Sequence, residues 1–224
     1  MNEKNPGVQR ALCGYANKMK KAFFMNHLSL STREQKAVFY GLIVFSLVYA
    51  YELTHFNLSI DDEFMAFSHA CNFSAIGRWL HTLIRKTLWF QVTVPTGPLL
   101  IFGAALALAY VFILRIMSVA LWKAGHLVVF AAFVLFPTWM AQMEFVGNLI
   151  PVGVGTVCAV LAAWMLLGPL ALQGVRWPLW GRMLAAVALT AVAVGAYQSL
   201  PLLTLVLVLA GAVRHIAGGG GGWY

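Results

Sequence analysis

Charged residues are scarce in this sequence of 224 residues, in which Asp, Glu, Lys and Arg together make up only 10%. A soluble globular domain carries about 25%, so too few charged side chains exist here to cover a water-facing surface. The three cysteines, Cys13, Cys71 and Cys158, are odd in number and far apart, which excludes a small disulfide-stabilised scaffold. With 61% hydrophobic residues, the composition predicts an integral membrane protein.

Signatures of several common sites are also missing. The sequence has no Gly-rich phosphate loop, so nucleotide binding has no support. Its six histidines show no close spacing of the kind that metal sites use. The low content of charged residues also excludes a nucleic-acid binder whose basic residues form a surface patch. Chemistry must therefore be sought in isolated polar residues that interrupt a hydrophobic chain.

Long uncharged runs predict an all-α, polytopic transmembrane helical bundle. No segment alternates with period two, as the strands of a membrane barrel would. The first run, 37–51, lacks a small-residue cleavage site and is interpreted as an uncleaved helix. Tyr197–Pro201 splits the last run into a helical hairpin, and Pro151 predicts an irregular start to the fourth span. We expect six spans, near residues 37–53, 97–115, 126–142, 150–169, 182–197 and 200–216.

The predicted organisation has three parts. Residues 1–36 form a basic cytoplasmic tail, residues 37–217 form the transmembrane domain, and residues 218–224 form a flexible glycine-rich end. With the tail inside, twelve of the fifteen Lys and Arg residues fall on the inner side, as the positive-inside rule requires. The three on the outer side are Arg78, Arg85 and Lys86.

Five of the seven acidic residues lie beyond the tail, and this topology puts all of them at or outside the outer boundary: Glu52, Asp61, Asp62, Glu63 and Glu144. The polar turn Tyr197–Gln198–Ser199 falls on the same side. Polar groups at the edge of lipid often mark function. Simple solvation of a loop remains an alternative for the acids, and interfacial anchoring remains one for Tyr197.

The segment 73–91 predicts an amphipathic helix lying in the outer interface. Its apolar face comprises Trp79, Leu80, Leu83, Ile84 and Leu88, and its opposite face comprises Arg78, His81, Thr82 and Arg85. The segment could be a plain interfacial strut. Alternatively, Arg78 and Arg85 face an anionic headgroup, since guanidinium groups bind phosphate in a bidentate manner.

These motifs, in this order, resemble the bacterial and phage O-antigen glucosyl transferases of Gtr type II, which are polytopic, GT-C-like membrane glycosyltransferases. The matching pieces run from residue 37 to about residue 200: Asn57–Glu63, Gly77–Leu80, Gln142–Phe145 and Tyr197–Ser199. Members of the family are longer and have more spans. The resemblance therefore implies that this chain corresponds to an N-terminal, truncated portion.

The resemblance implies transfer of glucose from a polyprenyl-phosphate-linked donor to O-antigen of lipopolysaccharide, or a related glycan, outside the bacterial inner membrane. Asp61 or Asp62 would act as the general base. Arg78, with Arg85, would stabilise the departing phosphate. Glu63, Glu144, Tyr197 and Gln198 would bind the substrates. No cofactor is required, although Asp61 and Asp62 have the oxygen ligands that suit Mg²⁺ or Mn²⁺.

Two other functions stay open. A transporter or flippase for a lipid-linked sugar would need polar residues near the middle of its spans, and the predicted spans have almost none. A non-catalytic fragment is the third interpretation, favoured by the glycine run at 218–222.

Overall fold

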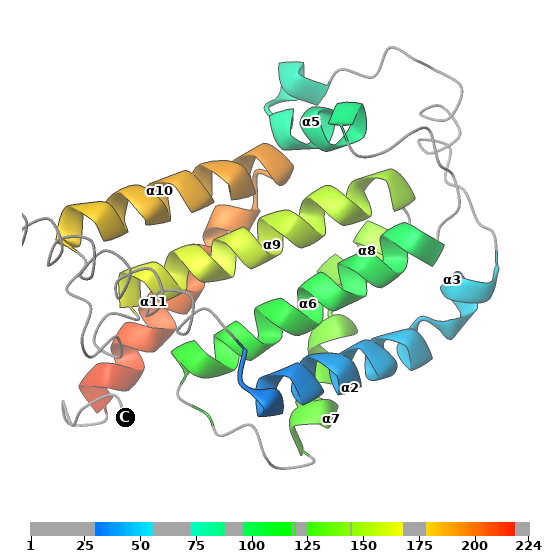
Figure 1. Cartoon of the computed structure of the whole chain (residues 1–224), viewed down its shortest axis with the longest axis horizontal. Helices are drawn as coiled ribbons and strands as arrows, with labels where there is room; N and C mark the ends of the chain where they lie inside the picture. Colours follow the sequence, from blue (N-terminus) through cyan, green and yellow to red (C-terminus); the bar gives the residue numbers. More distant parts are fainter. Residues whose placement is uncertain are drawn as a thin grey trace, which may run out of the picture.

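A computed structural model describes most of the chain, and the described residues are helical with no strand (Figure 1). They comprise residues 30–55, 73–87, 96–117, 119, 125–143, 145–167 and 178–217. The prediction of an all-α fold is confirmed. The helices are α2 (Thr32–Val48), α3 (Ala50–Thr54), η1 (Phe73–Ile76), α5 (Trp79–Thr87), α6 (Thr96–Ile116), α7 (Gly125–Val134), α8 (Pro137–Met143), α9 (Val146–Leu167), α10 (Leu179–Ala196) and α11 (Leu200–Ala217).

Helix α9 is the centre of the bundle and packs against α6, α10 and α11. Small residues let the backbones approach closely, as is usual between helices in membranes. A Cβ at Gly153 would lie 3.0 Å from the Cβ of Ala105 in α6. One at Gly155 would lie 2.5 Å from the Cβ of Ala196 in α10. Larger residues at these positions would push α6 and α10 away from α9.

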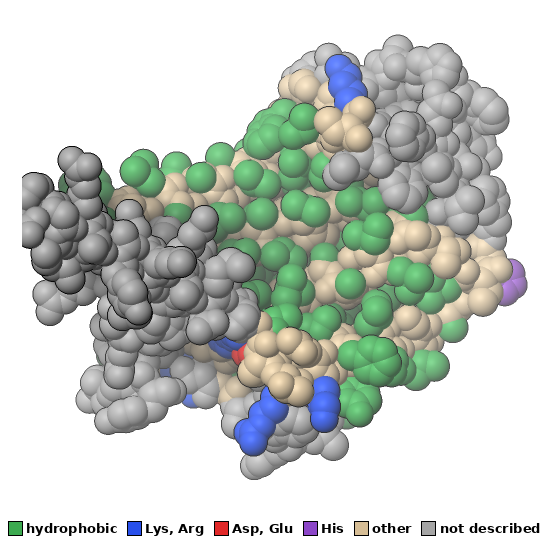
Figure 2. Space-filling model, in the orientation of Figure 1, with side chains coloured by type: hydrophobic (Ala, Val, Ile, Leu, Met, Phe, Trp, Pro, Cys, Tyr) green, Lys and Arg blue, Asp and Glu red, His purple; other side chains and the backbone are tan. Residues whose placement is uncertain are grey.

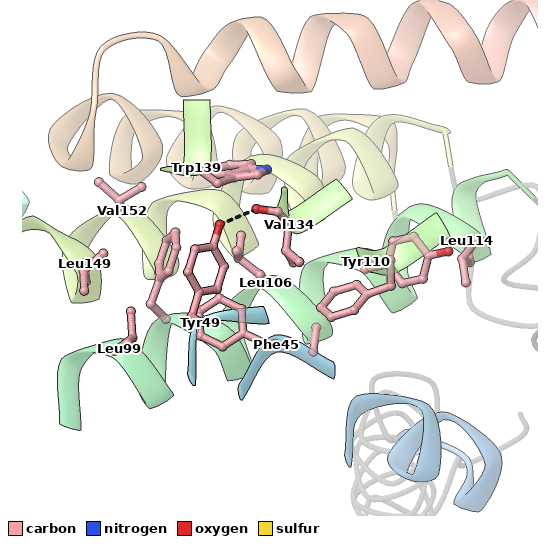
Figure 3. Close-up of a cluster of buried hydrophobic side chains, with 13 residues drawn as sticks. Phe45, Tyr49, Leu99, Leu106, Tyr110, Leu114, Val134, Trp139, Leu149 and Val152 are labelled. Atoms are coloured by element: carbon pink, nitrogen blue, oxygen red, sulfur yellow. Dashed lines mark hydrogen bonds between the residues drawn. The ribbon is translucent and has the colours of Figure 1, made fainter. Parts of the chain in front are cut away.

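An aromatic cluster joins α2, α6 and α8 (Figure 3). Phe45 and Phe102 are fully buried, and their rings meet edge to face with centroids 6.3 Å apart. Trp139 meets Phe102 in the same geometry at 6.1 Å. Offset aromatic pairs of this kind add about 0.5–1.5 kcal/mol each beyond the area they bury. This cluster fixes α2 against the body of the bundle.

The predicted span 126–142 is broken in two. Helices α7 and α8 meet at an angle of 58° across Leu135 and Phe136, just before Pro137, whose ring and missing N–H interrupt a helix. The break is stabilised from outside, because the Tyr49 hydroxyl donates a 2.6 Å hydrogen bond to the Val134 carbonyl (Figure 3). The region of the predicted span is therefore a bent pair of helices.

Two further expectations concern α9 and the last hairpin. The irregular start predicted at Pro151 is wrong, because α9 runs unbroken from Val146 to Leu167. The hairpin is confirmed, since α10 ends at Ala196 and α11 begins at Leu200.

The six predicted spans are not confirmed by length and composition. Within the described residues, α6, α9 and α10 are long and apolar enough to cross a membrane, and the bent pair α7–α8 makes up to four. Helix α2 has 17 residues, which corresponds to about 26 Å at ~1.5 Å per residue, short of a hydrocarbon core of about 30 Å. The apolar part of α11 is likewise short, covering Leu200–Arg214.

The direction of the long helices nevertheless alternates along the chain. The start of α2 meets the end of α6 through Glu34 and Arg115, so these helices are antiparallel. Arg182 at the start of α10 donates to the carbonyls of Met165 and Leu166 at the end of α9. α10 is therefore antiparallel to α9. On the face shown in Figure 2, hydrophobic side chains are spread along the helices, and Lys and Arg side chains lie near α5 and near the start of α2.

Candidate functional site

The short helix α5 lies across the end of the bundle, against α9 and α10 (Figure 1). Leu80 and Ile84 are buried in a cluster with Ala159 of α9, with Ala193 and Ala196 of α10, and with Leu200 of α11. Leu80 and Ile84 thus form the apolar face of an amphipathic helix, and this face packs against the bundle.

The face of α5 that contacts the bundle differs from the predicted one. His81 and Thr82 are buried, at 2% and 7% exposure, whereas Leu83 is 50% exposed. The prediction of a polar face containing His81 and Thr82 is therefore wrong for these two residues. Periodicity identifies the apolar side of a helix, but it does not reveal which neighbours that helix will pack against.

The backbone turns sharply just before α5. Gly77 has φ of +81°, a left-handed conformation that side chains with a Cβ rarely adopt. Its N–H donates to the Ser74 carbonyl at 3.0 Å. The Gln198 side-chain amide donates to the Ile76 carbonyl at 2.8 Å, and a Cβ on Gly77 would lie 3.1 Å from that amide nitrogen. Gln198, in the turn between α10 and α11, thus anchors the turn at Gly77 that precedes α5.

Arg78 follows this turn and lies on an aromatic ring. Its guanidinium carbon is 4.6 Å from the centre of the Tyr197 ring, a cation–π contact. The side chain is half-buried. Within the part of the chain that the structure describes, the ion pair is Glu34 with Arg115, and no carboxylate pairs with Arg78. A stacked guanidinium keeps its planar edge of N–H donors for a bidentate oxyanion.

Two contacts fasten α5 farther along. The indole of Trp79 lies directly over Gly195 of α10, where any Cβ would overlap the ring. The His81 ring nitrogen Nε2 lies 2.9 Å from the Gly147 carbonyl oxygen in the first turn of α9. A carbonyl oxygen can only accept a hydrogen bond, so Nε2 carries the proton in this pair.

The predicted site residues divide into those that the structure brings together and those it does not describe. Arg78, Tyr197 and Gln198 form one contact group at the α5 end of the bundle. Arg85 belongs to α5. Asp61, Asp62, Glu63 and Glu144 lie outside the described residues.

The described residues that border the acidic segment also lie at a helix end. His55 follows α3, and its ring stacks on that of Tyr51 with centroids 4.0 Å apart. Thr96, at the start of α6, donates to the Leu53 carbonyl at 3.4 Å. The end of α3 therefore lies beside the start of α6. That is the end of the bundle opposite the Glu34–Arg115 pair.

Sequence reasoning missed three polar groups at buried positions. They are His81, the Thr82 hydroxyl and the Gln142 carbonyl oxygen Oε1. Among the described residues, the last two have no hydrogen-bond partner. A signal for His81 was present: Pro151 has no N–H, so it cannot bond the carbonyl four residues earlier, that of Gly147. Such a carbonyl needs a donor from elsewhere.

A metal-binding group is not found in the described segments, where no three His, Cys, Asp or Glu side chains come together. The pair that could supply oxygen ligands, Asp61 and Asp62, falls in the gap between residues 55 and 73. Metal chemistry at this site therefore rests on the ligand types alone.

A large shift in pKa is found at the other end of the bundle. Arg115 donates to both carboxylate oxygens of Glu34, and Ser31 donates to it through its N–H and its hydroxyl at 2.8 Å each. Burial raises the pKa of Glu34, but these hydrogen bonds from Arg115 and Ser31 outweigh burial and lower it to about 2. This pair closes the α2–α6 contact and is a structural feature.

Comparison with known proteins identifies one family. No curated protein and no solved structure matches the chain. The family model described as glucosyl transferase GtrII matches residues 50–219, about three quarters of the chain, from α3 to the end of α11. The match includes α5 and the α10–α11 turn, whose residues Arg78, Tyr197 and Gln198 meet in the fold. The chain therefore belongs to the GtrII glucosyl transferase family.

Proposed function

We propose that the chain transfers glucose from a polyprenyl-phosphate-linked donor to O-antigen or a related cell-surface glycan, on the periplasmic side of the bacterial inner membrane. The observation that carries this proposal is Arg78. It is a half-buried cation, stacked on Tyr197 at one end of an apolar bundle. A phosphate attached to a lipid reaches the same depth, since its tail lies in the bilayer and its charge at the interface.

The proposed chemistry needs a base and a phosphate-binding cation. Asp61 or Asp62 takes the proton from the acceptor hydroxyl. The acceptor oxygen then bonds to the glucose anomeric carbon as that carbon's bond to the phosphate oxygen breaks. Arg78, together with Arg85, stabilises the negative charge on the departing polyprenyl phosphate. If Mg²⁺ or Mn²⁺ takes part, Asp61 and Asp62 would hold it and it would add positive charge beside the phosphate.

We assign the substrate contacts to four further residues. Glu63, Glu144, Tyr197 and Gln198 orient the sugar hydroxyls or the phosphate. Tyr197 and Gln198 also hold Arg78 and the turn before it, through the ring contact and the bond to the Ile76 carbonyl. Support for a shared site comes from this contact group, to which we add the acidic residues by proposal.

The sidedness rests on charge. Arg33, Lys36 and Arg115 gather at the end of the bundle that carries the Glu34 pair, opposite α5. The basic tail strengthens the same bias. Positive residues remain in the cytoplasm during insertion. The α5 end is therefore assigned to the periplasm, with the N-terminus in the cytoplasm.

A flippase for a lipid-linked sugar has less support. The buried threonines within the spans, Thr156 and Thr204, donate to the carbonyls of Val152 and Ala159. They therefore serve helix packing rather than a polar path through the bilayer.

Carboxylate variants test the proposal. Cells that supply polyprenyl-phosphate-glucose express Asp61→Asn, Asp62→Asn or the double variant. The mass of the O-antigen is then measured by mass spectrometry. We expect at least one single variant and the double variant to lose the added hexose while inserting normally in the membrane. Glu52→Gln, in α3, is the matched control. Full modification by both single variants and the double variant would refute the assignment.

A further inference from the structure

We infer that His81 is a positioning residue for Arg78, because it replaces the backbone donor that Pro151 removes from α9. In an α-helix the N–H of residue 151 would bond the carbonyl of residue 147. Proline has no N–H, and the His81 Nε2–H donates to the Gly147 oxygen at 2.9 Å instead. This inference rests on the proposed function of Arg78.

The hydrogen bond to Gly147 involves a buried imidazole. His81 is only 2% exposed, whereas Gly147 in the first turn of α9 is exposed, so the imidazole is the shielded partner of this part-buried bond. A buried imidazole N–H that loses its acceptor is unfavourable, because no water takes the place of that acceptor. The bond also accounts for the continuity of α9 through Pro151, where an irregular start was expected.

The geometry fixes Arg78 from both sides. On the N-terminal side, Gln198 holds the Ile76 carbonyl at 2.8 Å. On the C-terminal side, His81 is joined to Gly147. Arg78 lies between these two anchors in sequence, with its guanidinium on the Tyr197 ring. One anchor comes from the α10–α11 turn and the other from the start of α9, so the two together set the angle of α5 on the bundle.

A purely apolar packing role for His81 would not need this partner. The apolar contacts of α5 come from Leu80 and Ile84, which lie in a cluster with α9, α10 and α11. His81 contributes a directional bond to a particular backbone atom. The effect of replacing His81 should therefore depend on whether the new side chain can donate a hydrogen bond and on whether residue 151 has an N–H. This dependence distinguishes a positioning role from the mere filling of space.

The test uses four variants of the whole chain in membranes: His81→Leu, His81→Gln, Pro151→Ala, and His81→Leu with Pro151→Ala. Glutamine can carry its donor to about the position of Nε2. Alanine at 151 restores the helical N–H to the Gly147 carbonyl. Leu83→Ala, on the exposed side of the same helix, is the control.

Two readouts are measured. The first is the rate at which a water-soluble maleimide labels Leu80→Cys, buried under α5, with Cys13, Cys71 and Cys158 replaced by alanine. The second is kcat/KM for glucose transfer from polyprenyl-phosphate-glucose. We expect His81→Leu to raise labelling and lower kcat/KM by about tenfold each. We expect His81→Gln to stay near wild type in both, and Pro151→Ala to recover most of the loss in the double variant.

Equal effects of His81→Leu and His81→Gln, or no recovery with Pro151→Ala, would overturn the inference, because bulk rather than the bond would then matter. Altered labelling with unchanged kcat/KM in an active chain would overturn the role toward Arg78. If wild type transfers no glucose, the proposed function fails by itself, and the order of labelling rates still decides whether His81 is the anchor.

Discussion

Arg78 is surrounded by contacts that control its direction as well as its charge. Charge counting predicts the outer side for Arg78, and the chemistry of guanidinium predicts a phosphate partner; both stay predictions. Its stacking on Tyr197 was not predictable, because the two residues are separated by 119 positions in the sequence and only the fold joins them. The same holds for the bond from Gln198 to the Ile76 carbonyl.

At this scale we predict that Arg78→Lys and Arg78→Ala differ in severity. Lysine keeps the charge but loses the flat stacking and the two parallel donors. We expect kcat/KM for glucose transfer to fall about tenfold with lysine and about a hundredfold or more with alanine. Lys86→Ala, an exposed cation on the same helix, is the control. Full activity of Arg78→Ala would remove Arg78 from the reaction.

Glu34 gives a prediction about pH. Its pKa is about 2 in the folded protein against an ordinary value of 4.5, so the folded state holds the ionised form more tightly. The stabilisation is complete above about pH 4.5 and is lost as the pH falls towards 2. In detergent, Tm of wild type should therefore drop more than that of Glu34→Gln as the pH is lowered through this window. Parallel curves for the two proteins would show that the pair adds nothing.

Among the elements, the last hairpin followed from a local pattern, whereas the break in α7–α8 and the contact face of α5 did not. Tyr197–Ser199 predicted the hairpin, because this polar turn interrupts an apolar run, and α10 and α11 do end and begin on either side of it. Two prolines inside apolar runs had opposite outcomes. Pro137 divides α7 from α8, whereas Pro151 lies within a continuous α9. Tyr49 donates to the Val134 carbonyl at the break between α7 and α8, whereas His81 donates to the Gly147 carbonyl, whose helical donor Pro151 removes.

The packing of α5 against α10 leads to a prediction at the scale of the helices. Gly195 touches the Trp79 indole so closely that a Cβ would overlap the ring. We expect Gly195→Ala to displace α5 and to lower glucose transfer severalfold, and Trp79→Leu in the same chain to restore part of it. Gly125→Ala is the matched control, since a Cβ there meets nothing within 4 Å. Wild-type activity of Gly195→Ala would show that this contact does not set the position of α5.

At the scale of the whole molecule, the alternating helix directions agree with the predicted topology better than helix length does. The composition predicted a helical membrane protein, and the helices confirm it. The number of spans could not be read from hydropathy alone, because α2 is short and charged at its start and α7–α8 is bent. Three to four helices meet the length requirement in the described residues.

The orientation has its own prediction. Single cysteines at Lys86, Ser199 and Lys36, all exposed positions, are introduced into a chain with its own three cysteines replaced. A membrane-impermeant thiol reagent should label the first two in intact spheroplasts and Lys36→Cys only after permeabilisation. Labelling of all three from one side would contradict the assigned topology.

The most direct measurement of all is the transfer reaction with a defined donor. Membranes containing the wild-type chain are given lipopolysaccharide acceptor and either radiolabelled polyprenyl-phosphate-glucose or radiolabelled UDP-glucose without the enzyme that makes the lipid donor. We predict label in the O-antigen only from the lipid-linked donor, and none when Asp61→Asn and Asp62→Asn are combined. Transfer directly from UDP-glucose, or transfer that persists in the double variant, would contradict the proposed reaction.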